Sequence, residues 1–226
     1  MKNAIIYLGL ATALLASCSQ KEDIDSPSSV PVPEAVDLGL PSGLKWASFN
    51  LGASKPEEYG YYYAWGETET KDDYSWATYK WCMGDWNTMT NYCSKSDYGY
   101  NGFTDTRTIL NPKDDAAHVN LGGNWRMPTL AECLELKEKC TWTWTTQNGV
   151  NGRQVTGPNG NSIFLPAAGV RSDTDLYSVG DGGLFWSSSI DTDHPDSAIE
   201  VVFVSGNVSV STNSRRWGIP IRPVSK

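Results

Sequence analysis

Three consecutive serines, Ser187–Ser189, are followed closely by Asp191 and His194. These are the residue types of a serine hydrolase, in which an imidazole accepts the proton of the nucleophilic hydroxyl and a carboxylate orients the imidazole. The surrounding stretch, GGLFWSSSI, has neither the Gly-x-Ser-x-Gly pattern nor the strand–turn–helix context that exposes such a nucleophile. Strand periodicity instead places neighbouring serines on opposite faces. We therefore expect a core strand anchored by Trp186, no catalytic residues, and a protein that is not an enzyme.

Oxygen ligands for calcium could come from the stretch DTDHPD, which contains Asp191, Asp193 and Asp196. The stretch lacks the glycine and the terminal glutamate of an EF-hand loop, which favours a solvated acidic turn. The two histidines, His118 and His194, are far apart, and no HExxH motif occurs. We expect neither a metal site nor a cofactor.

Aromatic residues are abundant, with 10 Trp, 11 Tyr and 5 Phe. One interpretation is that they anchor the core, each burying on the order of 200 Å²; we expect this of Trp46, Trp65, Trp125 and Trp186. The other is that some stay exposed and stack on sugar rings or anchor a protein partner. The candidates for such ligand contacts are Trp76, Tyr79, Trp81, Trp86, Tyr98 and Tyr100.

The overall composition limits the class of partner. The chain has 226 residues, of which 39% are hydrophobic and 19% are charged, so it can form a packed core. Its formal net charge is −8. Nucleic acid is therefore not an expected partner, because phosphate binding needs a basic surface.

The first residues, MKNAIIYLGLATALLASC, predict export. The apolar run over residues 4–16 is too short for a permanent membrane span. The sequence LASC resembles the bacterial lipobox, which implies a signal peptide over residues 1–17 and a lipid on Cys18. The alternative is an ordinary signal peptide with a nearby cysteine. The next residues, SQKEDID, resemble the signal that sends Bacteroidetes lipoproteins to the outer face of the outer membrane.

Two further parts follow the expected signal peptide. Residues 18–35 are polar and proline-containing, which predicts a lipidated flexible tether. Residues 36–226 have globular composition without a second linker, and we expect one domain. The protein would then be anchored in the outer membrane through lipid only and exposed on the cell surface.

Four cysteines remain in the expected domain: Cys82, Cys93, Cys133 and Cys140. An even number in an exported protein suggests disulfides, with three possible connectivities. In an unbroken helix Cys133 and Cys140 would lie ~10 Å apart along the axis, too far for a bridge. Their role is expected to be structural, and whether they are bridged is left open.

Local patterns predict an α+β chain. Residues 36–50 predict a hairpin around Pro41–Gly43, and residues 59–103 predict a long loop-rich region. Ser54 and Glu57 have capping-box spacing, with Pro56 between them, and predict a short helix. Thr129 and Glu132 predict the start of a second helix, whose buried face would consist of Leu130, Cys133, Leu134 and the stem of Lys137. Short β-type runs follow.

Several motifs occur in order over residues 36–224: DLGLPSGLKWASFNLGA, YYYAWGET, NWRMPTLAE, LPAAGVR, FWSSS and IRPV. Together they resemble the Fibrobacter succinogenes major paralogous domain of Bacteroidetes surface lipoproteins. That family is similar to the C-type lectin-like fold of formylglycine-generating enzymes and of the variable proteins of diversity-generating retroelements. The resemblance implies paired terminal strands, two helices flanking small antiparallel sheets, and long loops that form a binding face.

The resemblance also implies where a ligand would bind. Formylglycine-generating enzymes use cysteines near the C-terminus, which this chain lacks, and the calcium motifs EPN and WND of lectins are absent. In the retroelement relatives the segment between the WSSS-like and RPV-like strands displays the binding side chains. Here that segment supplies Asp191, Asp193, His194, Asn207, Ser209, Ser211, Asn213, Arg215 and Trp217. Alternation places Ser209 and Ser211 on one strand face, as a half-exposed edge strand would also do.

We therefore expect a non-enzymatic surface lipoprotein that binds an extracellular glycan or protein through lectin-like loops. The alternative is an accessory or tip subunit of a surface adhesin or fimbrial assembly. The sequence DSA resembles the Bacteroidetes acceptor motif for O-glycosylation, which implies a sugar on Ser197.

Overall fold

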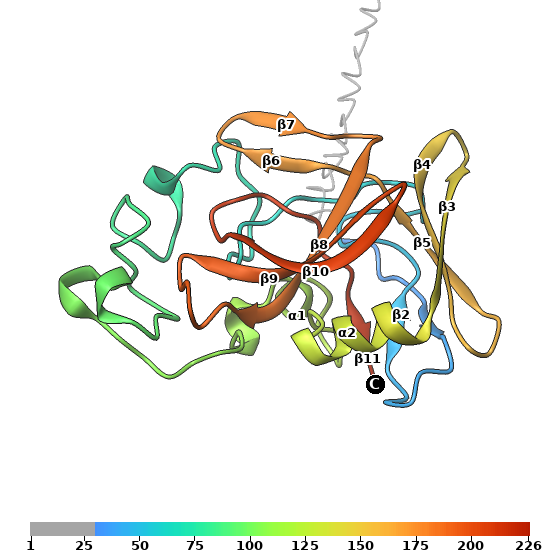
Figure 1. Ribbon diagram of the computed structural model, residues 1–226, viewed down its shortest axis with the longest axis horizontal. Coiled ribbons are helices and arrows are strands. Elements are labelled where there is room, and N and C mark those ends of the chain that lie inside the picture. Colours follow the sequence, from blue (N-terminus) through green and yellow to red (C-terminus); the bar gives the residue numbers. More distant parts are fainter. Residues whose placement is uncertain (1–29) are drawn as a thin grey trace, which may run out of the picture.

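A computed structural model describes residues 30–226, so the expected signal peptide, Cys18 and most of the tether lie outside the described residues. The described chain is α+β, with few helices and several small antiparallel sheets (Figure 1). The strands are β1 (Ala35–Asp37), β2 (Lys45–Ala47), β3 (Thr141–Gln147), β4 (Val150–Thr156), β5 (Ser162–Pro166), β6 (Val170–Ser172), β7 (Asp175–Tyr177), β8 (Gly182–Ile190), β9 (Ser197–Val204), β10 (Asn207–Ser214) and β11 (Val224–Ser225). The helices are α1 (Ala116–Leu121), α2 (Leu130–Lys139) and the 3₁₀ turns η1 (Trp76–Thr78), η2 (Ser96–Tyr98), η3 (Tyr100–Gly102) and η4 (Pro112–Asp114).

The hairpin expected over residues 36–50 is confirmed as the antiparallel pair β1–β2. Its connection turns at Gly43, whose N–H donates to the Leu40 carbonyl at 2.9 Å. Gly43 has φ 68°, a conformation that glycine adopts without a steric penalty. On its other side β2 pairs with β11, where Trp46 lies opposite Val224. One short sheet therefore joins the first and the last strands of the described chain.

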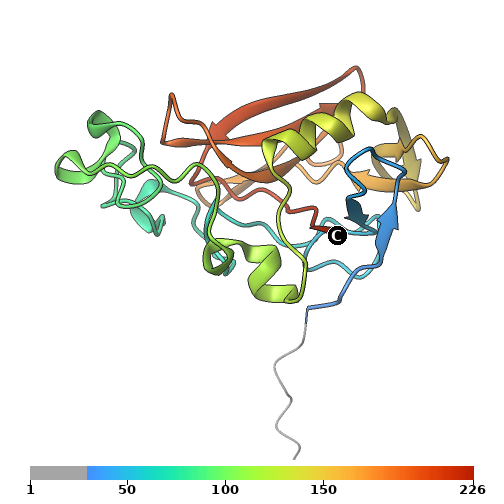
Figure 2. The same cartoon turned by 90° about the horizontal axis from the view of Figure 1, so that it is seen from below.

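The second sheet has the order β10-β9-β8 and carries α2 on one face. In Figure 2, α2 lies against the β9–β10 hairpin, whereas α1 lies apart from it. The expected capping box of α2 is confirmed, because the Thr129 side chain accepts from the Glu132 N–H and the Glu132 carboxylate accepts from the Thr129 N–H. The buried face is centred on Cys133 and Leu136 rather than on Leu130 and Leu134, which are only half-buried.

Two smaller sheets complete the fold, one with the order β3-β4-β5 and one formed by β6 and β7. The β3–β4 hairpin turns at Asn148 and Gly149, which have φ values of 48° and 85°. A two-residue type I′ turn matches the right-handed twist of the two strands, and it requires positive φ at both central residues. Asn-Gly adopts this conformation readily.

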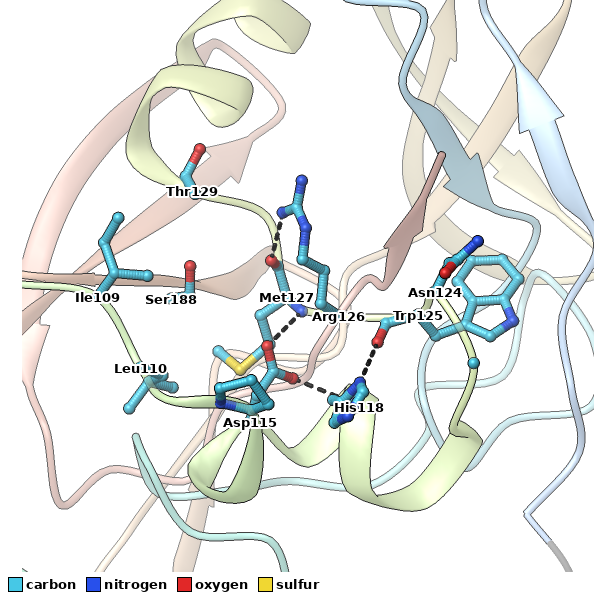
Figure 3. Close-up of a pocket in the computed structure, with 12 residues that line it drawn as sticks. Ile109, Leu110, Asp115, His118, Asn124, Trp125, Arg126, Met127, Thr129 and Ser188 are labelled. Atoms are coloured by element: carbon cyan, nitrogen blue, oxygen red, sulfur yellow. Dashed lines mark hydrogen bonds between the residues drawn. The ribbon is translucent and has the colours of Figure 1, made fainter.

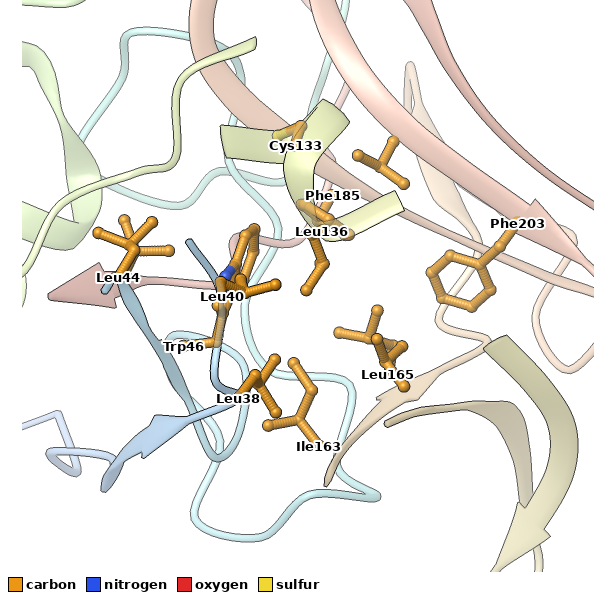
Figure 4. Close-up of a cluster of buried hydrophobic side chains, with 13 residues drawn as sticks. Leu38, Leu40, Leu44, Trp46, Cys133, Leu136, Ile163, Leu165, Phe185 and Phe203 are labelled. Carbon is orange, nitrogen blue, oxygen red and sulfur yellow. The ribbon is translucent and has the colours of Figure 1, made fainter. Parts of the chain in front are cut away.

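The first core cluster lies between α2, the β1–β2 hairpin and the strands β5, β8 and β9 (Figure 4). Trp46 has no exposed surface and packs edge to face on Phe185, with ring centroids 5.8 Å apart. The members of this cluster are Leu38, Leu40, Leu44, Trp46, Cys133, Leu136, Val155, Ile163, Leu165, Phe185, Val201, Phe203 and Val224. A second cluster, around Trp65 and Trp186, lies on the opposite face of β8. Trp46, Trp65 and Trp186 are thus confirmed as core anchors.

The loop-rich region expected over residues 59–103 is confirmed. Its outer part, residues 75–103, extends away from the sheets at the left of Figure 1, and we call it the loop lobe. This lobe has its own buried cluster, which includes Tyr79, Met89 and Cys93. Packing of aromatic and sulfur-containing side chains therefore orders a segment with almost no regular secondary structure.

The short helix expected after Ser54 is wrong. Residues 54–58 form a turn, in which the Ser54 N–H and hydroxyl both donate to the Glu58 carboxylate rather than to Glu57. Pro56 disfavours helical geometry in the residue before it, and Gly60 at φ 74° ends the segment. Too few residues remain between them for a stable helical turn.

Disulfides are not formed between the four cysteines of the described chain, all of which are free. Cys82, Cys93 and Cys133 are buried, and Cys140 is half-buried directly after the end of α2. Each thiol lies in a different packing environment, which the spacing of the cysteines along the sequence does not reveal. The expected structural role is fulfilled by burial of the side chains rather than by bridges.

Candidate functional site

The candidate residues from the C-terminal segment separate into exposed and structural groups. Asp193 and His194 are exposed in the β8–β9 loop. Asp191 accepts from the backbone N–H groups of both and lies 3.2 Å from the His194 imidazole. The loop is thus closed by its own first aspartate, as in an acidic turn. Across residues 30–226, no three His, Cys, Asp or Glu side chains gather as a metal site would require.

Arg215 is a correction, because it has no exposed surface and cannot contact a ligand from solution. Its guanidinium donates to the Tyr79 hydroxyl at 2.8 Å and to the Pro195 carbonyl at 2.8 Å. It also lies over the Trp65 ring, 4.9 Å from the centroid. Arg215 therefore links the loop lobe to the β8–β9 loop from inside the protein.

Tyr79 is the second correction, since it is 3% exposed and its hydroxyl donates to the Trp65 carbonyl. Burial raises the pKa of this phenol. Trp76 packs edge to face on Tyr79, and Trp81 donates its indole N–H to the Gly66 carbonyl, so both are half-buried. Tyr79, a candidate from the aromatic-rich loops, thus contacts Arg215, a candidate from the C-terminal segment. This contact is buried and is not open to a ligand.

The aromatic side chains that remain exposed belong to the outer surface of the loop lobe. Trp86 is 45% and Tyr100 is 43% exposed, while Tyr98 is half-buried. Trp86 and Tyr98 pack edge to face with centroids 5.5 Å apart. Flat rings fixed at a surface are suited to stacking on sugar rings or to anchoring a protein.

The polar face of β10 agrees with the expected alternation. Val208 and Val210 pack against the first core cluster, whereas Ser211 is exposed and Ser209 is half-buried on the other face. Asn207 is exposed at the turn into the strand. The remaining two candidates in this segment, Asn213 and Trp217, are half-buried.

Asn213 contacts a buried acid that the sequence did not reveal. Its amide lies 3.3 Å and 3.4 Å from the two carboxyl oxygens of Glu200, which is 3% exposed in the central strand β9. No cation pairs with this carboxyl among the described residues. Burial raises the pKa of Glu200 to about 7. A neutral carboxyl is favoured there because a buried charge without a partner is unstable.

The serines of β8 bind other segments of the backbone. Ser188 donates to the Pro128 carbonyl, Ser189 accepts from the Leu130 N–H, and the Ser187 carbonyl accepts the indole N–H of Trp65. Regular pairing with β9 is interrupted between Trp186 and Ile190, where these contacts form. None of the three hydroxyls has an imidazole as a hydrogen-bond partner.

A cavity of about 390 Å³ lies beside α1 (Figure 3). Figure 3 shows Asp115 at its base between His118 and Met127, with Trp125 at the opposite wall to Ile109. Asp115 accepts from the backbone N–H groups of His118 and Met127, and burial raises the pKa of this carboxyl. The sequence missed this cavity, because Trp125 was expected in the core and is instead half-buried in its wall.

Several polar side chains of this cavity already have hydrogen-bond partners. Arg126 forms a two-fold hydrogen bond with Glu132, at 2.6 Å and 2.7 Å, and His118 Nδ1 lies 3.2 Å from the Trp125 carbonyl. A carbonyl only accepts, so the imidazole proton lies on Nδ1. The walls that remain available are apolar: Ile109, Leu110, Trp125 and Met127. The cavity can therefore receive an apolar group of a ligand.

No family model, curated protein or solved structure matches the chain. No helix of residues 30–226 is long and apolar enough to cross a membrane.

Proposed function

We propose that this chain is a non-enzymatic cell-surface lipoprotein that binds an extracellular glycan or protein through the loops of a C-type lectin-like domain. The observation that carries this proposal is the construction of the loop lobe. Its interior is packed and linked to the sheets by Arg215, while Trp86 and Tyr100 are held at its outer surface. A rigid loop that presents aromatic faces loses little conformational entropy when it binds.

The lectin-like fold and membership of the Fibrobacter succinogenes major paralogous domain family are part of the same proposal, for a domain over residues 36–226. The pairing of β2 with both β1 and β11 supports it, because the resemblance implies paired terminal strands. The two helices α1 and α2 and the long loop lobe also agree with what the resemblance implies.

Binding is tested with the purified full chain on a glycan array and on a protein array, with and without calcium. We expect binding to at least one array, and its loss on Trp86→Ala and Tyr100→Ala. The matched control is Val119→Ala, because Val119 is 47% exposed on α1, outside the loop lobe. A folded sample that binds nothing on either array would overturn the proposal.

The proposed lipid anchor is tested separately, because it depends on Cys18 alone. Cys18→Ala should abolish incorporation of labelled palmitate and release the protein from the outer-membrane fraction. Cys140→Ala is the control with an unmodified domain thiol. Equal labelling of both variants would exclude lipidation at Cys18.

A second candidate function is favoured by one observation, the open edge of β10. This eight-residue strand pairs only with β9 and contains no charged residue and no proline. Such an edge is a template for strand addition from another chain. An accessory or tip subunit of a surface assembly would use it. A pull-down from intact outer membranes that recovers only monomer would exclude this role.

We also propose O-glycosylation of Ser197, the first residue of β9. Its backbone N–H donates to the His194 carbonyl, so the residue lies at the base of the exposed β8–β9 loop. The intact mass of the native protein, compared with that of Ser197→Ala, should differ by the mass of a sugar chain. Identical masses, after correction for the substitution, would refute the modification.

A further inference from the structure

A second pocket, about 280 Å³ in volume, lies between residues 60–74 and β6. It differs from the cavity beside α1 in that two of its charged side chains, Arg171 and Asp72, are not paired with other residues of the described chain. Arg171 makes no side-chain hydrogen bond and no ion pair within residues 30–226, and the same holds for Asp72. Its volume is close to the lower limit of small-molecule sites, about 300 Å³.

Arg171 is held in place without using its hydrogen-bond donors. Its guanidinium lies over the ring of Tyr62, 5.4 Å from the centroid. Tyr62 is itself fixed, because its hydroxyl donates to the Ala168 carbonyl at 2.6 Å. The backbone of Arg171 exchanges two hydrogen bonds with Gly218. Stacking orients the planar guanidinium and leaves its N–H groups free to donate to a ligand.

Tyr61 provides an aromatic wall that is equally well fixed. Its side chain is 47% exposed, and its N–H donates to the Leu51 carbonyl. The ring rests directly on Gly52, where a Cβ atom would lie 2.3 Å from it. Gly52 also has φ 82°, so the position requires glycine on two grounds. The result is an exposed ring with a defined orientation beside Arg171.

We propose that this pocket, which we call the Arg171 pocket, is a binding subsite for a neutral sugar ring. Vicinal hydroxyl oxygens would accept from the guanidinium of Arg171, sugar hydroxyls would donate to Asp72, and the C–H face would stack on Tyr61. The inference rests on the proposed function, since it names the class of glycan that the protein binds.

Three observations favour a neutral sugar over other occupants. An anionic sugar would meet the carboxylate of Asp72 and a chain whose formal net charge is −8. Lys71 does not compensate, because its ammonium is already bound to Glu67 and to the Thr78 carbonyl. A protein partner would need a desolvated apolar centre, whereas this pocket offers separate, unpaired polar groups around one ring.

Saturation-transfer NMR on the full chain tests the inference, with glucose, galactose, mannose, fucose and N-acetylglucosamine as probes. Glucuronic acid and N-acetylneuraminic acid serve as anionic probes. At least one neutral sugar should show saturation transfer. Arg171→Met keeps the stem but removes the donors, and should weaken binding by at least about tenfold. Arg171→Lys should weaken it less, because the charge remains without the planar fork.

Asp72→Ala should also weaken binding by about tenfold, since it removes the acceptor for sugar hydroxyls. The matched control is Lys80→Met, which removes another cation that is stacked on an aromatic ring, here Trp81 at 4.4 Å. Near-UV circular dichroism verifies that each variant is folded. Binding of the anionic probes alone would overturn the inference.

The remaining outcomes distinguish this inference from the proposed function. If sugars bind but only Trp86→Ala abolishes binding, the function stands and the Arg171 pocket is excluded. If the arrays show a protein ligand and no sugar, the function again stands without this subsite. If a peptide binds and Arg171→Met abolishes its binding, the pocket is a protein site. If neither arrays nor NMR show binding, both proposals fail.

Discussion

Buried polar side chains, rather than regular secondary structure, connect the loops of this protein to its sheets. The hydroxyl of Tyr79 donates to the Trp65 carbonyl and accepts from Arg215 Nε at 2.8 Å. Arg222 has the same role elsewhere, because its guanidinium donates to the Asn50 side chain and to the carbonyls of Ala47 and Phe164. Both arginines are fully buried without a carboxylate partner, so carbonyl dipoles must stabilise their charge.

Removal of one such hydroxyl should destabilise the protein measurably. Tyr79→Phe leaves the Trp65 carbonyl and an N–H of Arg215 unpaired in the interior. We expect a loss of about 1–3 kcal/mol in the free energy of unfolding, measured by urea denaturation. Tyr100→Phe is the control, since Tyr100 is 43% exposed and should change stability by less than about 0.5 kcal/mol. Equal denaturation midpoints for the two variants would contradict this assignment.

The buried carboxyl of Glu200 predicts a dependence of stability on pH. Its pKa is about 7 in the folded state and near 4.5 in the unfolded state. As pH rises from about 4.5 to 7, the unfolded carboxyl ionises while the folded one keeps its proton, so the folded state loses stability. The loss is on the order of 3 kcal/mol and is complete above about pH 7.

Glu200→Gln should therefore raise the melting temperature at pH 8 and change it little at pH 4.5, as measured by calorimetry at both pH values. Glu138→Gln on α2 is the control, because that carboxyl is exposed. Glu200→Gln could instead lower the melting temperature equally at both pH values. The amide would then not fit the buried site, and titration of Glu200 would not contribute to the pH dependence of stability.

At the level of elements, α2 depends on a local signal, the capping box of Thr129 and Glu132. Thr129→Ala removes the acceptor for an N–H of the first turn and should reduce stability by about 1 kcal/mol. The control is Thr143→Ala, on an exposed position of β3 without a side-chain hydrogen bond, which should cost less than about 0.5 kcal/mol. Thermal denaturation of both variants measures the difference. Equal effects would show that the cap contributes nothing specific.

Elements that depend on neighbouring residues could be predicted from the sequence, and elements that depend on distant contacts could not. The β1–β2 hairpin and the N-terminus of α2 are encoded within a few residues, and both were predicted. The turn at Ser54 has the same kind of local signal, but Pro56 and Gly60 override it. The prediction for the buried face of α2 was partly wrong, because the strands that pack on the helix bury Leu136 together with Cys133.

In the candidate site, too, features set by neighbouring residues could be predicted, and features set by distant contacts could not. The alternation along β10 follows from the strand period, whereas the sequence left open which aromatic side chains, Trp86 among them, stay exposed. The burial of Tyr79 and Arg215 could not be predicted, since it results from contacts between segments more than 100 residues apart in the sequence. Arg171 and Asp72 were missed because neither belongs to a recognisable motif, and only the folded chain places them in one pocket.

For the whole molecule, the free thiols predict a chemical test of the fold. Burial raises the pKa of the Cys140 thiol to about 11 and raises that of Cys133 as well, so neither is a reactive thiolate at neutral pH. Of the four cysteines in residues 30–226, only Cys140, which is half-buried, should be alkylated by iodoacetamide in the native protein, and slowly. In urea without reductant, Cys82, Cys93, Cys133 and Cys140 should all be alkylated. Peptide mass spectrometry that finds a bridged pair would contradict this.

The sheet β1-β2-β11 has a consequence for the order in which the chain folds. Arg222 donates to Ala47 and to Asn50, residues that precede it by 175 and 172 positions, and Val224 pairs with Trp46. The first hydrophobic core therefore lacks one wall until residues 222–225 are available. Folding from the N-terminus during synthesis cannot complete this core, and the contact order is high, which predicts slow folding. Such a chain stays unfolded for longer, which is compatible with the export across a membrane that we propose for it.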